Sequence, residues 1–314
     1  MSSAPIILVP GFWLGAWAWD DVAASLRADG FDVTAITLPG LESKDADRSA
    51  IGFADHVDAI VRAIEAADEP VVLAVHSATG YTGYAASDRV PERIAAMVYV
   101  DSAPGIPPQD PTFADAEKPL DWAELTAEEN LDGVSDDQKA TFRERGVPVP
   151  GGVLRDAYPL TNDARNDIPS TLICTAFTAA DYQKYSAEHP EWSWLAGIPE
   201  LRNATWVDLP TSHWPMWSKP AELAGLIGDV VPRPGAEPEA GDEDDRGAGH
   251  GGPPSGTRRV VSLAPVSRGY LSGPVRFGRG IDLKAGSARF PLSPRPPRSA
   301  PPAPAAGLRA PADR

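Results

Sequence analysis

Short apolar runs alternate with segments of helical periodicity along the first 231 residues, and no other feature constrains the fold as strongly. The runs have the length of strands buried on both faces, and the segments between them place apolar residues three or four positions apart. The strand-like runs are residues 5–11, 31–40, 70–77, 94–105, 170–177 and 204–210, and the helix-like segments are 16–30, 53–68, 80–90 and 219–231. This alternation predicts an α/β fold, with a mostly parallel sheet and helices on both of its faces.

One long segment, residues 106–169, interrupts the alternation. It is polar, acidic and rich in proline, with short helical patches. Loops of this length inside a compact α/β unit usually serve a function, and ligands of such folds bind at the carboxyl ends of the strands. We therefore predict one domain over residues 1–231, with a lid insertion at about 106–169.

The remaining residues, 232–314, differ in composition. From residue 231 onward, a third of the 84 residues are Pro or Gly, Lys and Arg number 13 against 8 Asp and Glu, and all nine tryptophans lie earlier in the chain. Such a segment cannot bury enough apolar surface to offset the loss of chain entropy. The composition predicts a disordered tail rich in Pro, Gly and Arg.

The net charge of the chain argues against two classes of partner. The first 230 residues hold 36 Asp and Glu against 15 Lys and Arg, and this negative charge argues against nucleic acid and anionic membranes as partners.

Cys174 is the single cysteine and lies in a strand-like run, so we expect no disulfide and a reducing, cytoplasmic location. The first residues lack the pattern of a signal or membrane helix, and no spacing typical of a metal site or phosphate loop occurs. We expect a small-molecule substrate and no cofactor; the oligomeric state stays open.

A serine stands where a buried strand gives way to a helix. Residues 71–83 read VVLAVHSATGYTG, and Ser77 follows the apolar run directly. A serine in such a strand-to-helix turn is either a nucleophile or a residue that caps the helix. A hydroxyl acts as a nucleophile only when a base accepts its proton and donors stabilise the oxyanion.

The chain has candidates for the base and for the oxyanion donors in the loops that follow its strand-like runs. Among five histidines, His213 alone lies in a loop between the last strand-like run and the last helix-like segment. The backbone N–H of Ala78, directly after the serine, and that of Phe12, in the loop after the first strand, are the expected oxyanion donors. His76 precedes the serine, and we interpret it as structural.

Four motifs together make the chain resemble the α/β-hydrolase family, in the branch of plant methylesterases, hydroxynitrile lyases and their bacterial relatives. These motifs are LVPGFWLGAWAWDDV (8–22), AVHSATG (74–80), VYVDSAPG (98–105) and LPTSHWPMWSKPAEL (209–223). The resemblance covers residues 4 to about 231 and implies a Ser-His-acid triad built on Ser77 and His213. Val75 and Thr79 stand where the family usually has glycines around the serine.

The acid of the triad departs from the family pattern. The resemblance places it at the end of the run 170–177, where this chain has Phe177. Some α/β-hydrolases take their acid from the preceding strand, which here ends in Asp101. We favour Asp101, keep Asp181 as the alternative, and interpret Asp208 as structural.

The expected activity is that of an esterase-type serine hydrolase, which cleaves a small, fairly apolar ester or lactone through an acyl-enzyme. Two alternatives remain. A hydroxynitrile lyase would use the same Ser and His, but such lyases often keep a lysine beside the histidine, where this chain has Trp214 and, six residues on, Lys219. A hydrolase-fold protein that only binds its ligand would explain Phe177, Val75 and Thr79.

Four tryptophans are candidates to line an apolar substrate pocket. They are Trp13, Trp122, Trp214 and Trp217. Packing in the core would explain each of them equally well.

Overall fold

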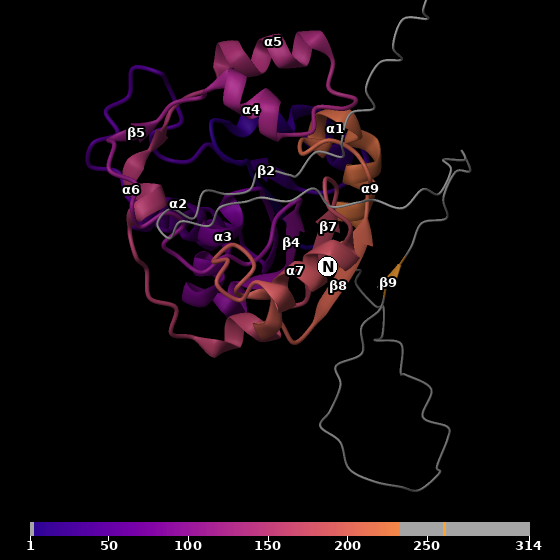
Figure 1. Cartoon of the computed structure of the whole chain (residues 1–314). Coiled ribbons are helices and arrows are strands. Elements are labelled where there is room, and N and C mark those ends of the chain that lie inside the picture. Colours follow the sequence, from indigo (N-terminus) through magenta and orange to yellow (C-terminus); the bar gives the residue numbers. More distant parts are fainter. Residues whose placement is uncertain (1–2, 233–259, 262–314) are drawn as a thin grey trace, which may run out of the picture.

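The computed structural model describes residues 3–232 and 260–261, and it contains the predicted parallel sheet (Figure 1). Each of the six predicted runs holds one strand, and every neighbouring pair in this sheet is parallel. The strands are β1 (Ile6–Val9), β2 (Val33–Ala35), β3 (Val71–His76), β4 (Ile94–Val100), β7 (Ser170–Cys174) and β8 (Ala204–Asp208). With the short β9 (Val260–Val261), their order is β2-β1-β3-β4-β7-β8-β9. The predicted fold class is confirmed.

Nearly all of the predicted tail, 232–314, lies outside the described residues. Within it the structure describes Pro232 and β9, which pairs with β8 at the edge of the sheet. The composition of the tail had indicated no strand there.

The strands are apolar on both faces because helices cover both. In β1, Ile6 and Leu8 belong to one buried cluster, whereas Ile7 and Val9 belong to the other. The side chains of a strand alternate between its faces, so each face needs its own cover. Cys174 of β7 is buried in the second of these clusters, as its strand-like run predicted.

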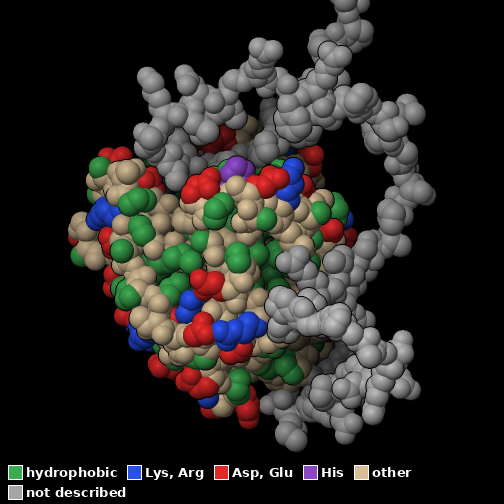
Figure 2. Space-filling view, turned by 60° about the horizontal axis from the view of Figure 1, so that its bottom comes forward, with side chains coloured by type: hydrophobic (Ala, Val, Ile, Leu, Met, Phe, Trp, Pro, Cys, Tyr) green, Lys and Arg blue, Asp and Glu red, His purple; other side chains and the backbone are tan. Residues whose placement is uncertain are grey.

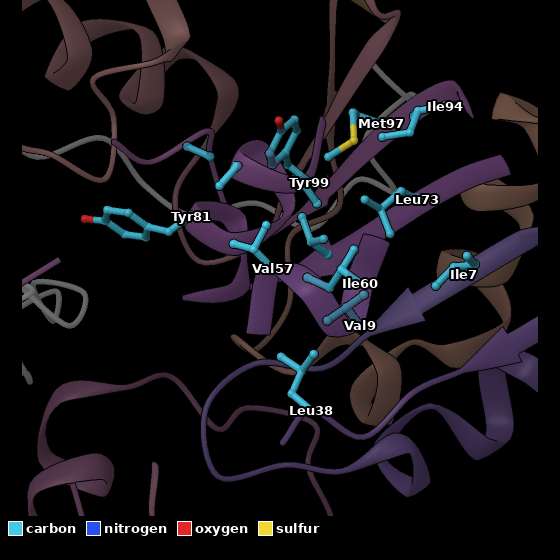
Figure 3. Packing of buried hydrophobic residues seen from close by; sticks show 14 of the residues in the cluster. Ile7, Val9, Leu38, Val57, Ile60, Leu73, Tyr81, Ile94, Met97 and Tyr99 are labelled. Atoms are coloured by element: carbon cyan, nitrogen blue, oxygen red, sulfur yellow. The ribbon is translucent and has the colours of Figure 1, made fainter. Parts of the chain in front are cut away.

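The first cluster packs under α1 (Asp20–Ala28) and α9 (Pro220–Val230), which lie side by side (Figure 1). The second packs under α2 (Phe53–Glu65) and α3 (Thr79–Arg89). In the second cluster, Val57 and Ile60 of α2 lie against the sheet (Figure 3).

Further helices connect these elements. They are the 3-10 helices η1 (Ala16–Trp19), η2 (Pro91–Arg93), η3 (Asp163–Asp167) and η4 (Ile198–Glu200), and the α-helices α7 (Ala179–Glu188) and α8 (Pro215–Ser218).

Residues 106–169 form a separate group of short elements between β4 and β7. They are the antiparallel strands β5 (Glu117–Lys118) and β6 (Val149–Pro150) and the helices α4 (Trp122–Glu128), α5 (Asp136–Arg145) and α6 (Gly151–Arg155), followed by η3. Helices α4 and α5 lie at the top of the molecule in Figure 1. Phe142 of α5 packs edge-on against Trp214 and Trp217, so an apolar contact joins this segment to the residues after β8.

The surface is acidic, as the composition of residues 1–230 requires. Asp and Glu side chains are spread over the face shown in Figure 2. No helix in the described part of the chain is both long enough and apolar enough to cross a membrane.

Replacement of a core residue of α2 tests the packing of this helix. Ile60 is fully buried, so we expect Ile60→Ala to lower the free energy of unfolding by about 2–5 kcal/mol, since it removes apolar contacts and leaves a cavity. Urea denaturation followed by circular dichroism measures this change. Arg62→Ala, at an exposed position of the same helix, should stay within about 0.5 kcal/mol; equal losses for the two variants would contradict the described packing.

Candidate active site

Ser77 lies in the sharp turn between β3 and α3. Its φ of 56° is in the left-handed region, which is uncommon for a residue other than glycine. The Ser77 N–H donates to the carbonyl of Val100 (3.2 Å), and the Ser102 hydroxyl donates to the Ser77 carbonyl (2.5 Å). Backbone strain held by surrounding contacts in this way is typical of functional positions.

The residues that replace the family's glycines fit this turn. The Thr79 hydroxyl accepts from the His76 N–H (3.1 Å) and donates to the His76 carbonyl (2.7 Å), so it braces the turn. Val75 fits because Gly83 faces it: a Cβ on Gly83 would lie 2.5 Å from Val75 Cγ1. Gly80 allows α3 to lie close to the loop after β4, since a Cβ there would lie 2.2 Å from the Ala103 carbonyl oxygen.

His213 connects the serine to a carboxylate. Its Nε2 lies 2.8 Å from Ser77 Oγ, and its Nδ1 lies 2.6 Å from Asp101 Oδ2. The backbone N–H of His213 donates to the carbonyl of Asn130 in the segment 106–169 (3.1 Å), which holds the loop after β8 in place. The structure thus brings together the three residues that the sequence indicated as nucleophile, base and acid.

Asp101 follows directly after β4 and is 5% exposed. Its Oδ1 accepts hydrogen bonds from the backbone N–H groups of Thr175 (3.1 Å) and Ala176 (3.2 Å) and from the Tyr182 hydroxyl (3.3 Å). Burial acts to raise the pKa of Asp101, but the hydrogen bond and charge of His213 and the two amides outweigh it, so the pKa is lowered. Asp101 is therefore an ionised partner for His213.

The other acid candidates lie elsewhere. Asp181 accepts from the Thr178 N–H (3.0 Å) and hydroxyl (2.7 Å) and so caps α7. Asp208 accepts from the Ala179 N–H (2.7 Å), a structural contact, as predicted. Phe177 packs edge-on against Tyr182 and Tyr185. None of these three contacts His213 in the described hydrogen bonds.

His76 links the loop that holds Phe12 to the loop that holds His213. Its Nδ1 accepts from the Gly11 N–H (3.3 Å), so its Nε2 carries the proton and donates to the His213 carbonyl (2.7 Å). Burial and the nearby charge of His213 lower the pKa of His76 to about 3, which keeps the ring neutral. A Cβ on residue 11 would lie 2.8 Å from His76 Nδ1, so this contact requires glycine.

Glu129 is a buried carboxylate near His213 that the sequence did not single out. Burial acts to lower the pKa of His213, but the charge of Glu129 and the hydrogen bond and charge of Asp101 raise it to about 9. Burial raises the pKa of Glu129 itself, although the charge of His213 opposes this in part. Glu129 stands in an acidic stretch beside Glu124 and Glu128, so no local signal distinguished it.

A cavity of about 430 Å³ opens at Ser77 and His213. Trp13 and Trp214 line it, as predicted. Trp122 and Trp217 are not among its lining residues, and this part of the prediction was wrong. Trp122 of α4 and Trp217 of α8 both pack edge-on against Phe142 of α5, which joins these three helices through an apolar contact. The segment 106–169 contributes much of the wall, including Phe113 and Glu129.

The two residues named as oxyanion donors also line the cavity. Phe12 and Ala78 both border it together with Ser77. Among the hydrogen bonds of the described turns and loops, the backbone N–H groups of Phe12 and Ala78 have no acceptor. They are therefore available to a bound ligand. Within the described residues, no group of three or more His, Cys, Asp or Glu is arranged to hold a metal ion.

Comparison with known families agrees with this geometry. The model of a family described as "Alpha/beta hydrolase family" matches residues 6–226. The chain belongs to this family.

Curated relatives place it in the branch that the motifs indicated. It is 26% identical to Methylesterase 7 of Arabidopsis thaliana over 258 residues, which are 72% of this chain and 95% of the relative. It is 31% identical to a carbendazim hydrolyzing esterase of Nocardioides sp. (strain SG-4G) over 101 residues, 32% of this chain and 42% of that one. The resemblance to the methylesterase branch is confirmed.

Solved structures share the fold. An extracellular α/β-hydrolase of a Paenibacillus species superposes with a TM-score of 0.59 at 21% identity, over 73% of this chain and 99% of that one. The methylesterase MES16 of Arabidopsis superposes with a TM-score of 0.58 at 18% identity, over 71% and 97%. At these identities the likeness concerns the fold alone.

The protonation of the two histidines can be tested directly. We expect His213 to titrate with a midpoint near pH 9, and His76 to remain a neutral Nε2–H tautomer throughout, because its pKa is lowered to about 3. Two-dimensional NMR of the ¹⁵N-histidine-labelled chain between pH 5 and 10 measures both, with His213→Ala for assignment. A His76 that titrates in this range, or that is protonated at Nδ1, would contradict the hydrogen bonds described above.

Proposed function

We propose that this protein is a serine esterase in which Ser77 is the nucleophile, His213 the general base and Asp101 the acid that orients it. The single observation that carries the proposal is the continuous hydrogen-bond chain from Ser77 Oγ through His213 to the ionised Asp101, with Ser77 and His213 lining a cavity. A serine that only caps a helix needs no histidine at 2.8 Å and no buried carboxylate behind it.

In the first half of the reaction, Ser77 Oγ attacks the carbonyl carbon of the ester and its proton passes to His213 Nε2. The negative oxygen that forms accepts hydrogen bonds from the N–H groups of Phe12 and Ala78. The bond to the alcohol then breaks as His213 returns the proton to the leaving oxygen. Asp101 stabilises the imidazolium throughout, which its lowered pKa favours.

In the second half, a water molecule replaces the alcohol. It loses its proton to His213, attacks the acyl group on Ser77, and releases the carboxylic acid as the proton returns to Ser77 Oγ. These steps use only side chains, backbone N–H groups and water, so the reaction requires no cofactor.

The substrate is a small ester or lactone. A cavity of about 430 Å³ is in the usual range for small-molecule sites, and aromatic rings form part of its wall. The relatives are named as methylesterases and esterases, which supports ester cleavage here. The residue beside His213 in the chain is Trp214, where such lyases often have a lysine. The cavity wall holds Lys118 together with five carboxylates, and no observation favours the lyase chemistry.

Covalent labelling tests the proposal. We expect a fluorophosphonate probe to form one adduct per chain on Ser77, located by mass spectrometry of the peptides, and Ser77→Ala and His213→Ala to abolish it. Because His213 must be neutral to accept the proton and its pKa is raised to about 9, labelling should quicken as the pH rises toward 9. Absence of an adduct in a folded protein would leave a ligand-binding role for the cavity.

A pair of variants separates the two acid candidates. We expect Asp101→Asn to lower kcat by about 10³–10⁴-fold for any ester that the protein cleaves, because His213 loses the partner that orients it. Asp181→Asn makes the same change at the N-terminus of α7, away from His213, and should lower kcat less than about threefold. Equal losses, or a larger loss in Asp181→Asn, would remove Asp101 from the mechanism.

A further inference from the structure

The wall of the cavity is strongly acidic on the side formed by residues 106–169. Within the described chain it includes five carboxylates and one lysine, namely Asp110, Asp115, Glu124, Glu128, Glu129 and Lys118. A cavity with this charge repels anionic ligands and attracts cations.

Glu129 differs from the other four carboxylates because it is buried and incompletely paired. It is 8% exposed, and its Oε2 is buried with no hydrogen-bond partner among the described residues. A buried carboxylate oxygen without a donor costs free energy, and such an atom in a native structure calls for a partner from outside the chain. Glu129 lines the cavity, so a bound ligand can supply that partner.

Backbone hydrogen bonds hold Glu129 near His213. Its N–H donates to the Leu125 carbonyl (2.8 Å) at the end of α4, and the next residue, Asn130, accepts from the His213 N–H (3.1 Å). The Asn130 side chain also donates to the Thr211 carbonyl (3.3 Å). Glu129 is therefore held beside His213 by hydrogen bonds on both sides.

We propose that the cavity takes esters whose alcohol part carries an ammonium group, and that Glu129 binds this group. The proposal rests on the esterase function proposed above. His213 returns its proton to the leaving alcohol, so the alcohol part of the ester lies on the side of the cavity where Glu129 stands.

A matched pair of esters tests this. Protonated 2-(dimethylamino)ethyl acetate and 3-methylbutyl acetate have the same shape. The cationic N–H of the first replaces a C–H of the second, so only the first carries a charge and can donate a hydrogen bond to Glu129. We expect kcat/KM at pH 7 to be at least about tenfold higher for the amino ester, the size of a hydrogen bond to a charged group in a desolvated site. Glu129→Gln should reduce this ratio to about one.

The ratio of the two kcat/KM values separates binding of the cation from any effect of Glu129 on His213. Glu129→Gln also changes the pKa of His213, but this change acts on both esters alike and cancels in the ratio. Glu144→Gln removes the same charge at an exposed position of α5 and should leave the ratio as it is in the native protein.

Calorimetric titration at pH 7 with 2-(dimethylamino)ethanol and with 3-methylbutanol gives a second measurement that needs no turnover. We expect the protonated amino alcohol to bind more tightly to the native protein and this preference to vanish in Glu129→Gln. If neither measurement shows a preference for the cation in the native protein, the proposal is overturned, while labelling of Ser77 and cleavage of the neutral ester would still support the esterase.

Two further outcomes are distinguishable. A preference for the cation that survives Glu129→Gln overturns the assignment of Glu129. Binding of the amino alcohol that depends on Glu129, in a protein whose Ser77 forms no adduct, would support the ammonium site and refute the esterase.

Discussion

The register between β3 and β4 is the constraint on which the site depends. His76 lies opposite Val100 in this parallel pair, so the next residues of the two strands, Ser77 and Asp101, emerge at the same edge of the sheet. Both have positive φ values, 56° and 40°, which turn the chain away at the end of each strand. His213 then needs only to reach from the loop after β8 to contact both.

The loops around this edge are tied to one another through hydrogen bonds of the backbone. His76 joins Gly11 to the carbonyl of His213, and Asn130 joins the segment 106–169 to the N–H of the same residue. The backbone of His213 is thus held from two sides. Such bracing limits the motion of the imidazole, and positioning of this kind is a large part of what a catalytic site contributes.

Burial and two neighbouring carboxylates, Glu129 and Asp101, determine how readily His213 is protonated. Asp101 is buried yet ionised because two amides, a tyrosine hydroxyl and His213 stabilise its charge. Glu129 adds a second negative charge near the ring, and His76 stays neutral beside it. In the proposed reaction these charges favour the imidazolium form, which stabilises the charge that develops when Ser77 gives up its proton, and they require a raised pH for His213 to start neutral.

Much of this could be predicted from the sequence, because periodicity and strand ends are local properties. Apolar runs indicated the six strands of residues 6–208, and the turn after one of them indicated Ser77. Asp101 was preferred over Asp181 because it ends the strand next to the serine, and the structure has Asp181 as a helix cap. The burial of Glu129, and the packing of Trp122 and Trp217 on Phe142 instead of in the cavity, had no local signal. The sequence by itself determined the order of the elements and which residues stand at the strand ends. Only the tertiary structure decided which carboxylates and rings of residues 106–169 face the cavity, because that depends on contacts between segments far apart in the chain.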